Sequence, residues 1–379
     1  MQVGVICEQC LAPVPGGTGR YSRELAMALA ATAPEGSSVL GVTAFHRSRL
    51  TLGGARDEGL GVAGPGERRA IPAIRVERLP LPRRALVAAW ERGVGPRVPG
   101  DVVHAPTPLH PARRTRPLVV TVHDAVPWTH PQTLTPRGVS WHREMVGRAA
   151  RTADLVVLPT QAVADELARH VPLGQVLVVG EGVSGDLDLP PDAEQRAAAM
   201  NLPERYLLTV ATLEPRKGLA QLVEALRHVP GIPLLCVGQD GWGDRAPLRD
   251  AAQGFGVDVR LMGRVADADL AVLLDRASAL VVPSLSEGFG LPLLEGMAAG
   301  IPVLTSDAPA LVEVAGGAAL AVPLSDLVDG LRQITTDEAL RARLQVAGPV
   351  RAAHFTWEKA AEQLWRAYRN LREGDIEQA

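Results

Sequence analysis

The amino-acid sequence predicts an α/β protein built from two doubly wound domains, and three observations support this. Short apolar runs rich in β-branched residues alternate with helical patterns along the chain. These runs are apolar on both faces, as strands are in parallel sheets that helices cover on both sides. The chain has 379 residues, and a single domain usually takes roughly 100–200 residues.

The first predicted domain comprises residues 1–184. Its strands are expected at Val3–Cys7, Val39–Val42, Val102–His104, Leu118–His123, Leu155–Pro159 and Val176–Val179. Its helices are expected at Thr18–Thr32, Gly138–Arg151 and Gln161–His170, where apolar residues recur at helical spacing, and Thr160 is a predicted helix cap. Residues 46–82 are rich in Gly, Pro and Arg and are predicted to form a long loop.

Residues 185–203 contain prolines and a small charged cluster, and we expect them to link the domains. The second predicted domain, residues 204–355, has expected strands at Tyr206–Ala211, Leu234–Val237, Val259–Met262, Ala279–Val282 and Val303–Ser306. Its helices are expected to start near Gly218, Ala246, Asp269, Pro292, Ala310 and Ser325. Residues 356–379 form an amphipathic helix that we expect to pack toward the N-terminal domain; a helix lying on a membrane surface is the alternative.

Composition excludes several classes of protein. With 46% apolar and 21% charged residues, the chain is neither a disordered protein nor a coiled coil. Three cysteines cannot form a disulfide scaffold and fit a reducing compartment. No uncharged apolar stretch reaches the roughly 18 residues of a membrane span. The first residues lack the basic region of a signal peptide, so we expect a cytoplasmic protein.

Charge is distributed unevenly along the chain. Residues 1–175 carry 21 Arg and 14 acidic residues, whereas the remainder carries 18 basic and 28 acidic residues. A cationic first half favours an anionic partner, such as a phospholipid surface or a phosphorylated substrate. The alternative is an Arg-rich genome, because the chain has 37 Arg and only two Lys. Peripheral contact with the cytoplasmic face of a membrane therefore stays open.

The strongest chemical signal is a pair of glutamates eight residues apart. Glu287 lies in the loop after a predicted strand, and Glu295 is expected in the first turn of the next helix. Pro292 suits the first positions of that helix, which we therefore expect to start close to Leu291. One carboxylate can accept a hydrogen bond from a sugar hydroxyl and the other from a ribose diol. The alternative for Glu295 is that it only offsets the helix dipole.

The loop between the glutamates is suited to a phosphate. Gly288 and Gly290 let the backbone approach a ligand closely and turn N–H groups toward it. A helix N-terminus favours an anion such as a diphosphate. The loop therefore predicts a site for a polyol phosphate.

This Glu-x7-Glu pattern resembles that of the retaining, nucleotide-sugar-dependent glycosyltransferases of family 4, the glycosyl transferases group 1. The resemblance covers nearly the whole chain and includes four further motifs in the family's order. It implies the GT-B fold, with two Rossmann-like doubly wound domains facing across a cleft. It also implies that the donor sugar nucleotide binds the C-terminal domain.

Two of the further motifs lie in the first domain. Pro15–Gly19 is a Gly-rich turn after the first strand, and the family places this loop near the donor diphosphate and the acceptor. Its donor-binding candidates are Gly16 and Gly17; the alternative is a plain turn. The family also places a histidine that contacts the donor sugar at the position of His123. His123 would stabilise developing charge or fix a sugar hydroxyl; the alternative is a structural histidine.

The other two motifs lie in the second domain. Arg216 and Lys217 follow a strand, and the resemblance implies that they neutralise the leaving diphosphate. The commoner family form has Arg at the position of Thr212, so the role of Arg216 rests on its place beside Lys217. Gly263 and Arg264 lie in a turn whose backbone meets the nucleobase in the family.

Together these motifs give a set of candidate residues. The catalytic candidates are His123, Lys217, Arg216 and Glu287. The donor-binding candidates are Gly16, Gly17, Arg216, Lys217, Gly263, Arg264, Glu287, Gly288, Phe289, Gly290, Leu291 and Glu295. No metal is expected, because Asp267 and Asp269 directly precede a helix and are interpreted as caps. No cofactor is expected beyond the nucleotide sugar.

The resemblance implies that a hexose moves from a nucleoside diphosphate to an acceptor hydroxyl with retention of configuration. GDP-mannose is the first expectation for the donor and UDP-glucose the next. The acceptor is expected to be a sugar or lipid-linked molecule of glycolipid or polysaccharide synthesis, and no nucleic acid is expected. Residues 1–180 are expected to choose the acceptor, and within them Arg83–Trp90 could contact it. The alternatives are another GT-B enzyme, such as an epimerase or phosphorylase, and a non-catalytic scaffold that binds sugar nucleotides.

Overall fold

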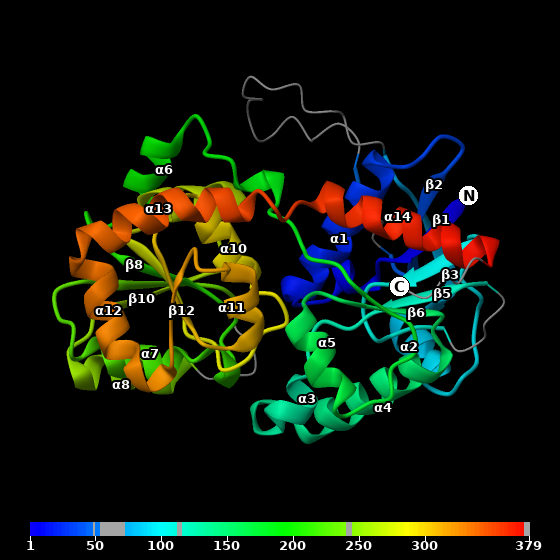
Figure 1. Ribbon diagram of the computed structural model, residues 1–379, viewed down its shortest axis with the longest axis horizontal. Coiled ribbons are helices and arrows are strands. Elements are labelled where there is room, and N and C mark those ends of the chain that lie inside the picture. Colours follow the sequence, from blue (N-terminus) through cyan, green and yellow to red (C-terminus); the bar gives the residue numbers. More distant parts are fainter. Residues whose placement is uncertain (48–49, 54–72, 112–115, 240–244, 375–379) are drawn as a thin grey trace. The chain divides into compact units, whose positions relative to one another are not determined.

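The computed structural model describes residues 1–47, 50–53, 73–111, 116–239 and 245–374. The chain forms two compact units (Figure 1). The first unit comprises Met1–Gly182 together with Thr356–Ala379, and the second comprises Val183–Phe355. Each unit is a parallel sheet with helices packed on it.

The first unit is built on a seven-stranded sheet in the order β3-β2-β1-β4-β5-β6-β7, and every strand pair is parallel. The chain starts in the middle of this sheet, winds to one edge and then to the other, which is the doubly wound order. The strands are β1 (Gln2–Ile6), β2 (Ser38–Phe45), β3 (Arg75–Pro82), β4 (Val102–Ala105), β5 (Leu118–Thr121), β6 (Leu155–Leu158) and β7 (Val176–Val178).

The helices of the first unit include one from the end of the chain. They are α1 (Gly16–Ala31), α2 (Arg83–Glu91), α3 (Val126–Thr129), α4 (Pro136–Thr152), α5 (Gln161–Ala168) and α14 (Trp357–Glu373), with short 3-10 turns η1 (Glu8–Leu11) and η2 (Pro131–Thr133). Helix α14, red in Figure 1, packs against α1, blue. The indole of Trp365 donates a hydrogen bond to the Leu29 carbonyl at 3.0 Å, which ties the two helices together.

The second unit repeats the winding on six parallel strands in the order β10-β9-β8-β11-β12-β13. The strands are β8 (Leu207–Val210), β9 (Leu234–Val237), β10 (Val259–Gly263), β11 (Ala279–Val282), β12 (Val303–Ser306) and β13 (Leu320–Val322). Strands β8 and β11 are neighbours although β9 and β10 separate them in the sequence. This order brings the loops that follow β8 and β11 together.

Helices cover both faces of the second sheet. They are α6 (Ala193–Ala199), α7 (Leu219–Leu226), α8 (Arg245–Phe255), α9 (Asp267–Arg276), α10 (Leu291–Ala298), α11 (Pro309–Ala315), α12 (Leu327–Thr336) and α13 (Glu338–Ala352), with 3-10 turns η3 (Gly185–Leu187), η4 (Pro215–Lys217) and η5 (Leu324–Asp326). The core under α7, α8 and α12 is aliphatic, with Leu222, Leu331 and Ile334 fully buried against the strands.

The segment predicted as a long loop, residues 46–82, is only partly irregular. Its last residues form β3, which pairs in parallel with β2 at the edge of the first sheet. An edge strand is open to solvent on one side, so it carries Arg and Pro instead of the apolar run that the prediction relied on. Residues 54–72 of the predicted loop lie outside the described residues.

The segment predicted as a linker, residues 185–203, belongs to the second unit. It contains α6, which packs on α9. The guanidinium of Arg196 on α6 bonds to Asp192 and to Asp269, each at 2.8 Å. The boundary between the units falls between Gly182 and Val183. A short polar helix held by charged groups does not show the apolar periodicity from which helices are predicted.

Candidate functional site

The loops that follow β8 and β11 lie against each other in the second unit. The amide of Leu285, after β11, donates to the carbonyl of Arg216, after β8, at 2.8 Å. Gly218 has a φ of +68°, and a Cβ there would lie 1.9 Å from the Pro283 carbonyl oxygen. Only glycine therefore fits where the two loops cross.

This contact brings Lys217 and Arg216 to the carboxylate of Glu287. The Lys217 ammonium lies 2.5 Å from Glu287 Oε1, and the Arg216 guanidinium lies 3.0 Å from Oε2. The Ser284 hydroxyl donates to Oε1 at 2.7 Å. Three predicted site residues are thus joined in one cluster, although Lys217 and Glu287 are 70 positions apart in the sequence.

A second carboxylate, which the sequence reasoning missed, completes the cluster. Glu214 Oε2 lies 3.2 Å from Arg216 Nε, and the Thr212 hydroxyl donates to Glu214 Oε1 at 2.7 Å. Thr212, where the commoner family form has Arg, therefore orients this glutamate. The sequence did hold a signal for this ion pair, because Glu214 and Arg216 are two positions apart in one loop.

The cluster fixes the ionisation of its members. Burial would raise the pKa of Glu287, but the charges of Lys217 and Arg216 outweigh burial and lower it to about 2. Burial and the neighbouring Arg216 charge lower the pKa of Lys217 below its ordinary value. Glu287 is therefore a carboxylate at neutral pH, with both oxygens bonded. It can accept hydrogen bonds from hydroxyls, but it is suited neither to proton transfer nor to nucleophilic attack.

The start of α10 differs from the prediction in two details. Glu295 is the fifth residue of α10, not a first-turn residue, and it is only 2% exposed. Phe289 is buried, with its ring edge-to-face against Phe355 at 5.4 Å between centroids. Gly290 caps the helix with a φ of +95°, and a Cβ there would lie 2.4 Å from a Leu311 methyl group.

Two other predicted segments of the second unit are also placed. Gly263 ends β10 with a φ of +70°, and its carbonyl accepts from the Gly238 amide at 2.9 Å. Arg264 is exposed. Asp267 and Asp269 are not caps, because Ala266 is the cap residue of α9. They lie within the first turn of α9, where a negative charge offsets the helix dipole.

In the first unit, His123 lies just beyond the carboxyl end of β5. Its Nε2 lies 2.8 Å from the Pro106 carbonyl oxygen, and its Nδ1 lies 3.7 Å from Glu181 Oε1. The ring of Tyr21, on α1, packs edge-to-face on the imidazole at 4.6 Å between centroids. The sequence did not predict this contact between Glu181 and His123.

Of the other candidate residues in the first unit, the two glycines are exposed, whereas a histidine and a tryptophan are buried. Gly16 and Gly17 are exposed at the start of α1, with open space where a Cβ would lie. His104 is fully buried and bonds to Tyr368 and Thr121, so its role is structural. The prediction that Trp90 meets an acceptor is wrong, because its side chain is 1% exposed and packs within the unit.

No described helix has both the length and the apolar character needed to cross a bilayer. Within the same residues, no group of three or more His, Cys, Asp or Glu is arranged to hold a metal ion.

Comparison with known sequences identifies the family. Residues 15–186 match the family described as Glycosyltransferase Family 4, and residues 192–351 match Glycosyl transferases group 1. The O-antigen chain mannosyltransferase B of Escherichia coli is 29% identical over 71% of this chain and 74% of its own. The phosphatidyl-myo-inositol mannosyltransferase of Mycobacterium leprae is 31% identical over 67% of each chain.

Comparison with solved structures identifies the fold. The sucrose-phosphate synthase of Thermosynechococcus elongatus superposes with a TM-score of 0.75 at 24% identity, over 99% of this chain and 100% of the other. Anabaena HepE in complex with UDP and glucose superposes with a TM-score of 0.71 at 18% identity, over 98% and 100%. At these identities the likeness concerns the fold. The two family matches, the mannosyltransferase relatives and the two doubly wound sheets show that this chain belongs to the glycosyl transferases group 1 and has the GT-B fold.

Proposed function

We propose that this glycosyltransferase moves mannose from GDP-mannose to an acceptor hydroxyl with retention of configuration. The observation that carries the proposal is the cluster of Lys217, Arg216 and Glu287, which presents two cations and an ionised carboxylate in one loop pair. The choice of mannose is supported by the E. coli and M. leprae relatives, both of them mannosyltransferases. UDP-glucose is the second candidate, since HepE was solved with UDP and glucose.

The cluster suits a donor that carries both phosphates and a sugar. Lys217 and Arg216 would hold the leaving diphosphate, helped by the backbone of 288–291 at the start of α10. Glu287 would then accept hydrogen bonds from the sugar hydroxyls. Glu295 would bind the ribose diol. Gly16 and Gly17 would approach the diphosphate, and the turn at Gly263 and Arg264 would meet the base.

The ionisation of Glu287 bears on the mechanism. Because two cations hold its carboxylate, Glu287 is a poor nucleophile, and a route through a glycosyl-enzyme intermediate on this residue is disfavoured. Transfer on one face of the sugar accounts for retention without such an intermediate. The bond from the anomeric carbon to the phosphate oxygen breaks, the bond to the acceptor oxygen forms, and the leaving phosphate takes the acceptor's proton. The protein cations replace a metal in this scheme.

For the acceptor, the proposal names a class of molecule and not a single compound. The first unit would bind a sugar or a lipid-linked acceptor, and the name of the M. leprae relative, a phosphatidyl-myo-inositol mannosyltransferase, supports a lipid. Peripheral contact with the cytoplasmic face of a membrane would follow from a lipid acceptor. The Arg-rich first half of the chain supports this part of the proposal.

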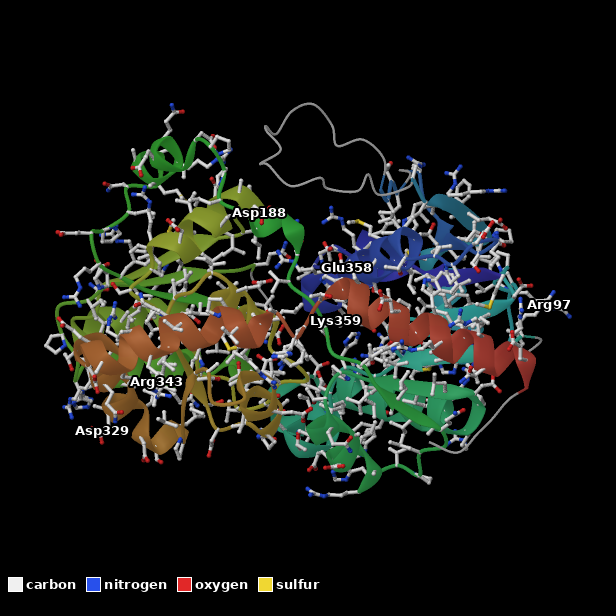
Figure 2. The ribbon with its side chains drawn as sticks, turned by 45° about the horizontal axis from the view of Figure 1, so that its top comes forward. Arg97, Asp188, Asp329, Arg343, Glu358 and Lys359 are labelled. Atoms are coloured by element: carbon white, nitrogen blue, oxygen red, sulfur yellow. The ribbon has the colours of Figure 1, made fainter. Side chains whose placement is uncertain are left out.

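A phosphorylase with a lysine-bound cofactor is less well supported. Only two lysines are present, and Lys217 is held by Glu287. The other, Lys359, lies next to Glu358 in the first turn of α14 (Figure 2), and both side chains are exposed. An exposed lysine on an outer helix face does not enclose a cofactor.

A thermal-shift screen with GDP, UDP, ADP and dTDP tests the donor base. GDP should raise the melting temperature most, since a ligand at about 100 times its Kd adds roughly 2.7 kcal/mol to the free energy of unfolding. The parent is then incubated with GDP-mannose and acceptor sugars in EDTA, and NMR gives the configuration of the product.

The outcomes of this screen separate the alternatives. A larger shift with UDP would replace GDP-mannose by a UDP-sugar. An inverted product, or activity that requires added manganese or magnesium, would refute the mechanism. Tight GDP binding without sugar transfer or donor hydrolysis would support the non-catalytic scaffold.

A further inference from the structure

A half-buried histidine and a buried glutamate meet at the carboxyl edge of the first sheet. His123 follows β5 and Glu181 follows β7, two strands farther along the sheet. The side chain of His123 is 14% exposed and that of Glu181 is 6% exposed. A carboxylate so well shielded from water must be compensated by a nearby positive charge or by hydrogen bonds.

The surroundings of the imidazole decide where its protons lie. Nε2 lies 2.8 Å from the Pro106 carbonyl oxygen, which can only accept, so Nε2 carries a proton. In a neutral ring Nδ1 would then carry a lone pair, and this lone pair would face the Glu181 carboxylate at 3.7 Å. A proton on Nδ1 turns that repulsion into an ion pair. Both ring nitrogens therefore favour the doubly protonated form.

The other groups near the ring do not oppose a positive charge. Tyr21, on α1, packs its ring edge against the imidazole, and burial raises its pKa, so its hydroxyl stays neutral. Burial lowers the pKa of His104, on β4, to about 3, so this histidine adds no competing charge. Asp124, next in the chain, is a second carboxylate. Burial alone would lower the pKa of His123, but the bonds and charges of Glu181, Pro106 and Asp124 outweigh burial and raise it.

We propose that Glu181 is a positioning residue that keeps His123 in its imidazolium form, so that His123 acts in sugar transfer as a fixed cation and not as a base. The catalytic half of this inference rests on the proposed function. An imidazolium has no lone pair and cannot take the acceptor's proton. It can place positive charge beside a phosphate or donate to an oxygen of the substrate. Removal of the acceptor's proton then falls to the leaving phosphate.

The first experiment measures the titration of His123 without any substrate. The nine histidines are isotope-labelled, their ring resonances are followed by NMR from pH 5 to pH 9, and His123 is assigned with the His123→Gln variant. The titration midpoint of His123 in the unmodified protein should lie above the ordinary value for histidine. Glu181→Gln keeps the shape of the side chain but removes the charge, and should lower the titration midpoint by about one pH unit or more, the usual effect of losing an opposite charge at this distance.

The chain offers a matched control for this measurement. Glu166 pairs with His170 at 2.9 Å, in the same unit but on the surface. Glu166→Gln removes this surface pair and should leave the titration of His123 and the activity unchanged. If Glu181→Gln does not fold, Glu181→Asp replaces it; the shorter side chain should give a smaller shift in the same direction. An unchanged His123 titration in either folded Glu181 variant overturns the inference.

The second experiment asks whether the imidazolium matters in transfer. Because the active form carries the proton, kcat/KM of the parent should fall as pH rises through the titration midpoint of His123. In Glu181→Gln this fall should move to lower pH by the same number of units as the NMR midpoint. A shifted midpoint with an unshifted rate profile overturns the catalytic half. If the parent transfers no sugar at all, the proposed function fails, and the NMR result still decides whether Glu181 protonates His123.

Discussion

The Lys217 ammonium lies 2.5 Å from Glu287 Oε1, and only 12% of the Lys217 side chain is exposed to solvent. Under the proposed function this charge stabilises the leaving diphosphate in the transition state. Lys217→Ala should therefore lower turnover at saturating donor by about 10²-fold, because loss of one preorganised donor typically raises the barrier by roughly 3–4 kcal/mol. Steady-state kinetics with the proposed donor measures this.

The control for Lys217 is the chain's other lysine. Lys359→Ala removes the same functional group from an exposed position on α14 and should leave turnover unchanged. If Lys217→Ala keeps normal turnover and only raises KM, the lysine contributes uniform binding and not transition-state stabilisation.

The two glutamates of the Glu-x7-Glu pattern should have separable effects. Glu287→Gln removes the carboxylate that competes for Lys217 and Arg216, so affinity for free GDP should be unchanged or higher while sugar transfer falls. Glu295→Gln should weaken the binding of free GDP, because a hydrogen bond from the ribose to a charged carboxylate is worth about 1.5–3 kcal/mol. Calorimetry with GDP and with a 2′,3′-dideoxy analogue measures these affinities. The analogue lacks the ribose diol, so it should bind the unmodified protein and Glu295→Gln equally. Weaker GDP binding in Glu287→Gln alone would reverse the two assignments.

At the scale of elements, the crossing of the β8 and β11 loops depends on Gly218. Gly218→Ala should reduce the free energy of unfolding of the second unit and lower activity, because its Cβ would collide with the Pro283 carbonyl. Urea denaturation measures the stability change. Gly231→Ala is the matched control, since Gly231 also has positive φ, +90°, but open space around it. The control should lose only the roughly 1–2 kcal/mol of left-handed backbone strain, and equal losses in both variants would refute the crossing argument.

Helix α14 should stabilise the first unit, although 173 residues of the second unit, Val183–Phe355, precede it in the chain. Trp365→Ala should cost about 3–5 kcal/mol, the usual range for truncating a buried aromatic side chain. Hydrogen exchange should show lost protection in β1, α1 and β4 and unchanged protection in the second sheet. Arg369→Ala, on the exposed side of α14, should change stability by about 0.5 kcal/mol or less. Loss of protection in both sheets would mean that α14 does not act on one unit alone.

At the scale of the whole molecule, the ionised cluster makes stability depend on pH. The pKa of Glu287 is lowered from 4.5 to about 2 in the folded protein, so its ionised form stabilises the fold above pH 4.5. This contribution is lost as pH falls toward about 2. The melting temperature of the parent should therefore exceed that of Glu287→Gln at pH 7, and the difference should shrink between pH 4.5 and the acid limit of folding.

An exposed carboxylate serves as the control for this pH series. Glu362, on the outer face of α14, is exposed, and Glu362→Gln should melt like the parent at every pH. A difference between the parent and Glu287→Gln that stays constant from pH 7 to the acid limit would show that Glu287 acts through packing and not through its charge.

Local patterns along the chain suffice to predict the fold class and most of the strands. Buried parallel strands must be apolar on both faces, and this local requirement is visible in runs such as Leu234–Val237 and Ala279–Val282. The sequence patterns missed β3 and β13, which lie at sheet edges, and the short polar helix α6. An edge strand and a short polar helix gain their stability from partners elsewhere in the chain. The sequence also identified the loops that carry Lys217 and Glu287, since glycines and charges cluster after a strand in each.

Which charged side chains meet depends on the order of the strands in each sheet. Lys217 and Glu287 are 70 positions apart, and they pair because β8 and β11 are neighbours in the sheet. His123 meets Glu181 because the ends of β5 and β7 lie at one edge of the first sheet. Burial of Trp90 and Glu295 was likewise invisible in the sequence, where an aromatic ring and a carboxylate suggested exposed contacts. Periodicity reports the surroundings of a residue along its own element, whereas ion pairs and burial depend on the elements that pack against it.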